Sequence, residues 1–356
     1  MVKKIFIILL AIILLIGIFE LVYSKFLYVN IWTKFANHTS LSKYYSKEEM
    51  DLTLKYRHEN HGNNCIEHGY TKENMRWHPR YGGFDKNIDI DCINNLFSKN
   101  TTNVIFFGGS VMANGQTPNY LTSIEYYLFK DNLNNFRTVN FAESSARMSN
   151  NLSMFIEYIP KINNVDYVIF LDGVNEFHSI KFNGEYDDDF YWTAGVKHRI
   201  HNPQYFLLDK ILEKSVLLKN IAIQFFNYQS NRNPNNLKIS DELIKKSADD
   251  YIYRKKIVKK LCNIYSLNCI FLLQPSFYIS KEMSGNKIEF INNYFEKYFP
   301  DNEYIYSLGY KYLREDQDLI DISSSFDGKE NIYLDDTHFD KFGSEIIADY
   351  LKKYIK

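Results

Sequence analysis

Short apolar segments alternate with longer amphipathic segments along the chain from about residue 101 onward. Continuous apolar runs are typical of strands buried on both faces of a parallel sheet, and amphipathic stretches are typical of the helices that cover it. Strands are expected at 104–107, 137–140, 167–171, 269–273 and 319–322. Helices are expected at about 120–131, 149–162, 240–266 and 341–355. The alternation predicts an α/β fold, a three-layer α/β/α sandwich with a mainly parallel five-stranded sheet.

A separate apolar segment occupies the first 24 residues. Two lysines precede an apolar run that extends from Ile5 to Phe19 and, after Glu20, to Tyr23. Roughly 18 helical residues at about 1.5 Å each reach about 27 Å, close to the thickness of a bilayer core. We favour an uncleaved membrane anchor, because the run is long for a secretory signal and no small-x-small cleavage site follows; a cleaved signal is the alternative. With either, the rest of the chain is expected on the exported side.

The remaining chain divides into a polar, irregular segment at 25–100 and an α/β domain at 101–356. The stretch at about 180–240 is longer than a normal connection, so we expect an insertion with helices of its own. Hydrophobic residues make up 45% and charged residues 24%, which excludes a mainly disordered chain. The net charge of −1 argues against a nucleic-acid partner, because nothing neutralises phosphates in bulk.

The four cysteines can be oxidised if the chain is exported, since that compartment permits disulfides. Pairing of Cys65 with Cys92 and of Cys262 with Cys269 is the simplest of three possible connectivities, and the sequence leaves the choice open.

A cluster of possible metal ligands lies in the polar segment, at His58, His61, Cys65 and His68. Its spacing matches no zinc pattern, and an oxidised Cys65 is not a ligand. The simpler interpretation is a polar segment that packs on the α/β domain, so no metal site is expected.

Residues with chemical potential follow the predicted strands. The first strand ends in Gly108-Gly109-Ser110, where two glycines allow a sharp turn that presents a serine. Asn175 follows the third strand, where its amide can donate to a developing oxyanion. Asp335 and His338 are three residues apart near the last helix, so the carboxylate can orient the imidazole as a general base. Reactive groups of open parallel sheets gather beyond the carboxyl ends of the strands, so these residues are expected to meet.

In this order the motifs resemble the SGNH hydrolases, also called GDSL-like lipases and acylhydrolases. The matching blocks are Gly108-Gly109-Ser110, Gly173-Val174-Asn175-Glu176 and Asp335-Asp336-Thr337-His338, with Leu273-Gln274-Pro275-Ser276 similar to the segment after the family's fourth strand. The resemblance covers residues 100–356 and implies the SGNH, flavodoxin-like form of the α/β sandwich. It also implies a serine nucleophile and no metal or organic cofactor.

Two positions depart from the family's pattern. Gly109 replaces the usual acidic residue before the nucleophile, a variant that is expected to cost little. Ser145 stands where the family has a glycine that donates its backbone N–H to the oxyanion. The donor is main chain, so it can still serve, although a Cβ atom can crowd the site.

The resemblance assigns catalytic roles to Ser110, Asp335 and His338. Ser110 attacks an acyl carbonyl, His338 takes its proton and Asp335 holds the imidazole. The oxyanion hole consists of the Ser110 N–H, the Ser145 N–H and the Asn175 side chain. Glu143 and Arg147 lie near the predicted site and are weaker candidates for substrate contact. His178 is a possible alternative base, less well supported than the Asp335–His338 pair.

The expected function is that of a serine esterase on O-acyl groups, most simply O-acetyl groups, of cell-envelope polysaccharide. An O-acyltransferase shares the same residues and differs in the acceptor. Lipid or thioester acylhydrolase activity is a further alternative. A non-catalytic envelope-binding protein on the same fold is the alternative from another class, and Ser145 is the feature that keeps it open. The expected partners are an acylated glycan or other acyl ester and, through the N-terminal helix, the membrane.

Overall fold

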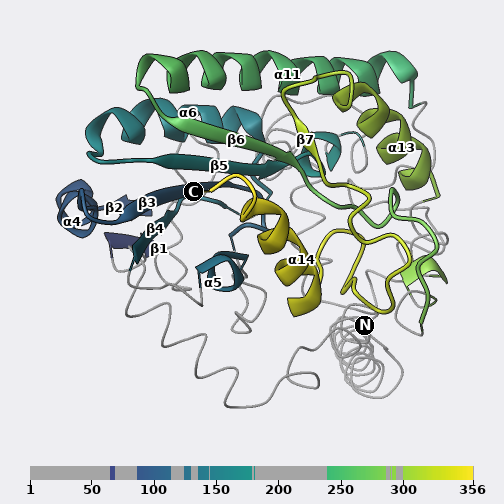
Figure 1. Ribbon diagram of the computed structural model, residues 1–356. Helices are drawn as coiled ribbons and strands as arrows, with labels where there is room; N and C mark the ends of the chain where they lie inside the picture. The colour runs from purple at the N-terminus through teal and green to yellow at the C-terminus, as the bar shows by residue number, and fades with distance from the viewer. Residues whose placement is uncertain are drawn as a thin grey trace, which may run out of the picture. The chain divides into compact units, whose positions relative to one another are not determined.

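A computed structural model provides the structure of the chain (Figure 1). It describes residues 65–68, 86–113, 124–129, 135–143, 145–178, 180, 239–285, 289, 291–293 and 300–355. These residues belong to one compact unit formed by Ser40–Ala194 and Leu237–Lys356. Among them, no helix is long and apolar enough to cross a membrane. The expected anchor or signal at 1–24 and nearly all of the expected insertion at 180–240 lie outside the described residues, so both remain predictions.

A parallel five-stranded sheet forms the centre of the fold, as the apolar runs predict. Its strands are β3 (Thr102–Gly108), β4 (Phe136–Asn140), β5 (Tyr167–Asp172), β6 (Asn268–Leu273) and β7 (Ile320–Asp321). They lie in the order β4-β3-β5-β6-β7, and every neighbouring pair is parallel. The order reverses between β3 and β5, and ligands of such sheets bind beyond the carboxyl ends of the strands at this switch point.

Helices cover both faces of the sheet, which confirms the α/β sandwich. On one face lie α6 (Met148–Tyr158), α11 (Asp241–Ile264) and α13 (Asn302–Leu313), and on the other lie α5 (Ile124–Phe129) and α14 (Lys341–Leu351) (Figure 1). Helix α11 begins at the N-cap Ser240, whose side chain accepts the Leu243 N–H. Such a cap is worth about 1 kcal/mol because it satisfies an otherwise unpaired donor.

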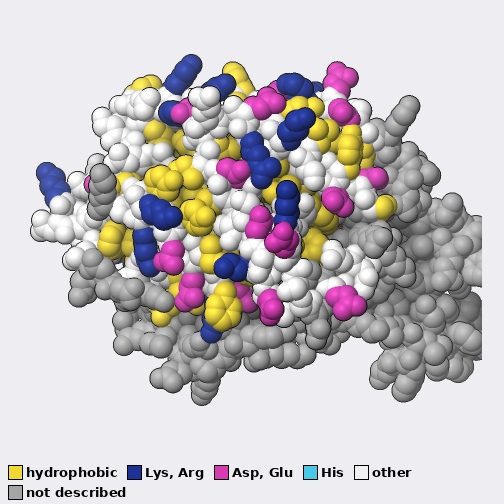
Figure 2. All heavy atoms as spheres, turned by 45° about the vertical axis from the view of Figure 1, so that its right-hand side comes forward, with side chains coloured by type: hydrophobic (Ala, Val, Ile, Leu, Met, Phe, Trp, Pro, Cys, Tyr) yellow, Lys and Arg dark blue, Asp and Glu magenta, His cyan; other side chains and the backbone are white. Residues whose placement is uncertain are grey.

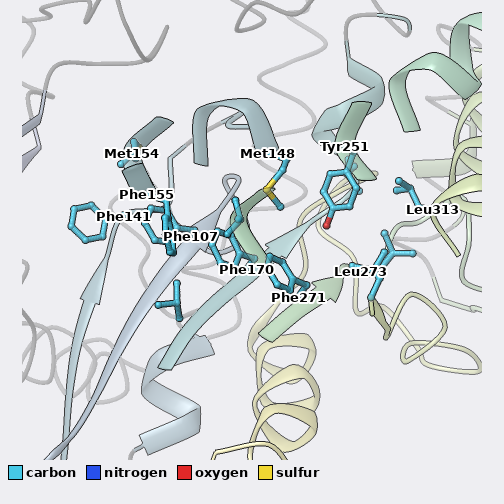
Figure 3. Close-up of a cluster of buried hydrophobic side chains, with 14 of the residues drawn as sticks. Phe107, Phe141, Met148, Met154, Phe155, Phe170, Tyr251, Phe271, Leu273 and Leu313 are labelled. Carbon is cyan, nitrogen blue, oxygen red and sulfur yellow. The ribbon is translucent and has the colours of Figure 1, made fainter. Parts of the chain in front are cut away.

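A row of stacked phenylalanines fills the layer between the sheet and the helices α6 and α11 (Figure 3). Phe107 on β3 stacks on Phe141 and on Phe170 of β5, at centroid distances of 5.3 and 5.1 Å. Phe170 stacks in turn on Phe271 of β6 at 4.8 Å. All four side chains are buried, and burial of one such ring contributes about 2 kcal/mol or more. Since a slip of one residue turns a side chain to the other face, the row also fixes the strand register.

Both disulfides have the sequential connectivity. Cys65–Cys92 joins the residue before β1 (Ile66–His68) to α4 (Ile90–Leu96), and Cys262–Cys269 joins the end of α11 to β6. Closing loops of these lengths, 27 and 7 residues, is worth about 3.6 and about 2.4 kcal/mol in the chain-entropy model.

Several elements differ from the sequence-based expectations. The segment at 25–100, expected to be irregular, contains α4 and an antiparallel pair of β1 with β2 (Lys86–Ile88). Helix α13 was not predicted. The expected helix at 149–162 is α6 followed by a 3₁₀ turn, η5 (Ile159–Lys161), because Pro160 has no N–H to continue the α-helical bonding.

On the described surface shown in Figure 2, basic and acidic side chains are interspersed with apolar ones, without a large area of one sign.

Candidate active site

Ser110 lies in a tight turn directly after β3. The N–H groups of Met112 and Ala113 donate to the Gly109 carbonyl at 3.1 and 2.9 Å, which closes the turn around the serine. Gly108 has φ 153°, and a Cβ atom there would lie 2.5 Å from the Leu171 carbonyl oxygen of β5. A residue without a side chain is therefore needed where β3 ends, and the turn that follows presents Ser110 with a half-buried side chain.

The Ser110 hydroxyl, the His338 ring and the Asp335 carboxylate form a continuous hydrogen-bonded chain. The Ser110 Oγ and His338 Nε2 atoms are 2.7 Å apart. On the other side of the ring, His338 Nδ1 and Asp335 Oδ2 are also 2.7 Å apart. This is the arrangement in which a carboxylate fixes the tautomer of a general base and the base activates a hydroxyl. It brings together residues that are 228 positions apart in the sequence.

A short loop holds the acid and the base in place. The N–H groups of Thr337 and His338 donate to Asp335 Oδ1 at 2.8 and 2.6 Å, and the Leu334 N–H donates to the His338 carbonyl at 2.8 Å. Two residues later, Asp340 caps α14 by accepting the Phe342 and Gly343 N–H groups. The loop is thus fixed from inside and from the helix that follows.

The charge state of Asp335 follows from these contacts. Burial acts to raise the pKa of Asp335, but the facing His338 and the hydrogen bonds from His338 and Thr337 lower it further than burial raises it. The pKa therefore lies below the usual range, and the group is a carboxylate at neutral pH. The His338 side chain is 43% exposed, so a bound ester can reach it.

Asn175 begins the 3₁₀ turn η6 (Asn175–Phe177) that follows β5. Its Nδ2 atom donates one hydrogen to the Ala146 carbonyl at 2.9 Å. A primary amide carries two N–H groups, so this bond orients the side chain and leaves the second N–H for another acceptor. Gly109 makes room for the amide, because a Cβ atom at position 109 would lie 2.1 Å from Nδ2.

Two backbone donors complete the region. Ser145 has φ 60°, in a turn closed by a 3.1 Å bond from the Ala146 N–H to the Glu143 carbonyl. Within the described part of the chain, the N–H groups of Ser110 and Ser145 have no hydrogen-bond acceptor. Together with Asn175 they belong to three segments that follow neighbouring strands, β3, β4 and β5. Donors left free beside a nucleophile are what an oxyanion hole requires.

The remaining candidates lie deeper than the triad. Glu143 and Arg147 are 3% and 4% exposed, and the Glu143 N–H donates to the Gly108 carbonyl at 3.0 Å. Arg147 faces the buried carboxyl of Glu176. Substrate contact by Glu143 and Arg147 therefore remains a prediction, from positions with little free surface. The imidazole on Ser110 belongs to His338 rather than to His178.

The possible metal cluster lies only partly within the described residues, among which no group of three or more possible ligand side chains is found. Cys65 is in a disulfide, and His58 and His61 lie outside the described residues.

Sequence reasoning missed two contributors to the site. The Ala146 carbonyl orients Asn175, and the Glu176 carboxylate accepts the Met148 N–H at 2.8 Å. Glu176 was visible only as the acidic residue next to the asparagine, and no sequence signal indicated Ala146.

No protein-family model and no curated protein matches the chain. Similar solved structures include an acetyl xylan esterase, with 13% identity and a TM-score of 0.38 over 71% of this chain and 100% of that one. A lipase/acylhydrolase from Enterococcus faecalis has 12% identity and a TM-score of 0.38, over 72% and 98% of the two chains. The acetyl xylan esterase Axe2 from Geobacillus stearothermophilus has 11% identity and a TM-score of 0.35, over 72% and 96%. Any inference about activity therefore depends on the geometry of the site itself.

Proposed function

We propose that the chain is an SGNH-type serine esterase that removes O-acyl groups, most simply O-acetyl groups, from cell-envelope polysaccharide. The observation that carries the proposal is the unbroken chain from the Ser110 hydroxyl through His338 to Asp335, with both hydrogen bonds at 2.7 Å. A serine hydroxyl is a weak nucleophile unless a base removes its proton, and this arrangement provides the base and the group that orients it.

The first half-reaction forms an acyl-serine. Ser110 Oγ attacks the ester carbonyl carbon while His338 Nε2 takes the hydroxyl proton, and Asp335 stabilises the resulting imidazolium. The carbonyl oxygen becomes an oxyanion that accepts from Ser110 N–H, Ser145 N–H and Asn175 Nδ2. The C–O bond of the ester then breaks, and His338 returns the proton to the departing alcohol oxygen.

The second half-reaction releases the acyl group. A water molecule loses its proton to His338 Nε2 and attacks the acyl carbonyl carbon. The bond to Ser110 Oγ breaks, and Oγ recovers the proton. If a sugar hydroxyl takes the place of water, the same residues transfer the acyl group to that sugar, so an O-acyltransferase is the alternative. Only the identity of the acceptor separates the two activities.

The proposed location is the exported side of a membrane, with the N-terminal segment as an anchor or as a cleaved signal. Two disulfides support an oxidising compartment, since such bonds are rare in the cytosol. The location in turn supports envelope polysaccharide as the substrate class.

The test is the release of p-nitrophenol from p-nitrophenyl acetate by the full chain and by its Ser110→Ala variant. Loss of activity in a folded Ser110→Ala protein, together with loss of labelling by a fluorophosphonate, is the expected result. Equal rates for both proteins would overturn the proposal. Release of acetate from acetylated polysaccharide then tests the substrate class, and transfer to an added glycan separates transferase from esterase.

A further inference from the structure

A closed ring of contacts connects two of the three proposed oxyanion donors, the Asn175 amide and the Ser145 N–H. The Asn175 amide donates to the Ala146 carbonyl at 2.9 Å, and Ala146 directly follows Ser145. Two residues further, the Met148 N–H donates to the Glu176 carboxylate at 2.8 Å. Glu176 is the neighbour of Asn175, so the ring returns to its start. The ring therefore contains the Asn175 amide and the turn that carries the Ser145 N–H.

Glu176 connects this ring to two helices through hydrogen bonds. Its carboxylate holds the first residue of α6, and its backbone carbonyl accepts the Ser247 hydroxyl of α11 at 2.7 Å. The next residue, Phe177, packs so closely on α13 that a Cβ atom at Gly309 would lie 2.4 Å from its ring. The turn that begins with Asn175 is therefore fixed against three helices, and Glu176 itself is 4% exposed.

The electrostatic surroundings of Glu176 are mixed. Burial raises the pKa of Glu176 to about 7, and Asp250 adds to the rise. Arg147, the Met148 N–H and Arg254 act in the opposite direction and lower it. Asp172 at the end of β5 has a pKa well above its usual range, first because of burial and then because of Glu176. The ionisable groups around Glu176 come from β5, α11 and the residue before α6: Asp172, Asp250, Tyr251, Arg254 and Arg147.

A carboxylate at this position is not explained by stability alone. Burying an ionisable group costs free energy, whether it is held as a desolvated charge or keeps its proton through a raised pKa, and replacing such groups by well-packed apolar side chains is often neutral or stabilising. An acceptor at the start of a helix is useful, but solvent or a neutral side chain provides it elsewhere. Glu176 directly follows Asn175 and accepts the N–H of the first residue of α6, which lies close in sequence to the Ser145 turn. It therefore links the two segments that carry the Asn175 amide and the Ser145 N–H.

We propose that Glu176 is a positioning residue that sets the separation of the Ser145 N–H and the Asn175 amide, and thereby the geometry of the oxyanion hole. The inference rests on the proposed function. Glu176 acts through the donors and does not touch the reacting atoms. Since donors stabilise the transition state only when they point to the place where charge develops, a small displacement lowers kcat more than it changes KM.

The test compares Glu176→Ala and Glu176→Gln with wild type in the full chain, using p-nitrophenyl acetate. Glutamine keeps an oxygen that accepts the Met148 N–H, and alanine does not. We expect kcat to fall about 100-fold in Glu176→Ala, the scale of one lost oxyanion donor, and about 10-fold or less in Glu176→Gln, with KM within about twofold of wild type in both. Rescue by the conservative variant separates positioning from a loss of fold.

Asp316→Asn is the matched control. Asp316 is also a buried carboxylate, with a side chain 4% exposed, and its partner Lys255 lies on α11. Its loss is expected to lower the free energy of unfolding while kcat stays within about twofold of wild type. The inference would be overturned if Glu176→Ala and Glu176→Gln were both as active as wild type while Glu176→Gln was as destabilised as Asp316→Asn.

A double-mutant cycle with Asn175→Ala checks the route of the effect. If Glu176 acts through the asparagine, Glu176→Ala lowers kcat much less in the Asn175→Ala background than in wild type, because residues that act as a unit are not additive. Equal effects in both backgrounds would also overturn it. An inactive and unlabelled wild-type protein would instead count against the proposed function, so the two failures are distinguishable.

Discussion

Gly109 and Asn175 are in such close contact that the space of a Cβ atom at position 109 is taken by the amide, 2.1 Å from Nδ2. From the sequence, glycine at position 109 was expected to be a variant of an acidic position with little effect. The structure shows why a glycine is needed there, because any side chain would displace Asn175. The amide would then lose its bond to the Ala146 carbonyl or move away from its place beside position 109.

Gly109→Ala is therefore expected to lower kcat/KM by about 100-fold, the scale of a lost oxyanion donor. Position 109 has no positive φ, so the added methyl group acts through the contact with Asn175 rather than through backbone strain. Steady-state kinetics on p-nitrophenyl acetate measure the effect. Gly328→Ala is the control, since it strains the backbone at φ 69° but meets no atom within 4 Å, and it should affect stability alone. Wild-type kinetics in Gly109→Ala would mean that the asparagine does not contribute.

Ser145→Gly is expected to retain activity and to raise the free energy of unfolding by up to about 1 kcal/mol. The backbone N–H is the proposed donor and survives the change, while glycine removes the strain of a side chain at φ 60°. Activity assays and urea unfolding check both parts. Ser266→Gly, at φ 57° and away from the site, should show a comparable gain without any effect on kinetics. A large loss of kcat in Ser145→Gly alone would assign a role to the serine hydroxyl.

Asp335→Asn is expected to lower kcat by about 10³-fold or more, because an amide can no longer hold the imidazole in the required tautomer and stabilise its charge. The neighbouring Asp336 provides a control of the same kind. Its carboxylate accepts hydrogen bonds from the hydroxyl groups of Tyr278 and Thr337, whereas Asp335 is the carboxylate bonded to the His338 ring. Asp336→Asn should therefore keep kcat within a few-fold of wild type. If the two variants lost activity equally, the assignment of the acid would be wrong.

The pKa of Glu176 predicts a pH-dependent stability. Folding raises this pKa from 4.5 to about 7, so the folded chain keeps a proton that the unfolded chain releases between these values. The free energy of unfolding should fall as the pH rises through this window, by on the order of 3 kcal/mol from this group. Urea unfolding of wild type and Glu176→Gln between pH 4.5 and 8 checks it, since the variant should have the flatter curve. Parallel curves would mean that Glu176 titrates normally.

The strands were predictable from the sequence because they depend on local pattern, and the triad was predictable because its motifs resemble those of a known family. Valines, isoleucines and phenylalanines in unbroken runs mark β3, β5 and β6, and their ends locate Ser110 and Asn175. The resemblance then implies that the acid and the base lie beside the nucleophile.

Helix α13 was harder to predict because Gly309 lies in its interior, where glycine lowers helix propensity. The glycine is there for the Phe177 ring, a tertiary contact that no local pattern reveals. A signal was nevertheless present in Ile305, Gly309 and Leu313, which recur at the i, i+4 spacing of a buried helix face. The pairing of Glu176 with Met148 is equally non-local, so the sequence could not show it.

The 228 residues that separate Ser110 from His338 have a consequence for how activity is lost. Almost every element of the sheet lies between the two, so a partly unfolded form that has released the last loop has no base beside its serine. Damaged or incompletely folded chains would then have no esterase activity, rather than a weak and unselective reactivity toward esters. The catalytic rate would also report directly on the docking of the last loop, because activity is lost as soon as that loop is released, even where the rest of the sheet is still folded.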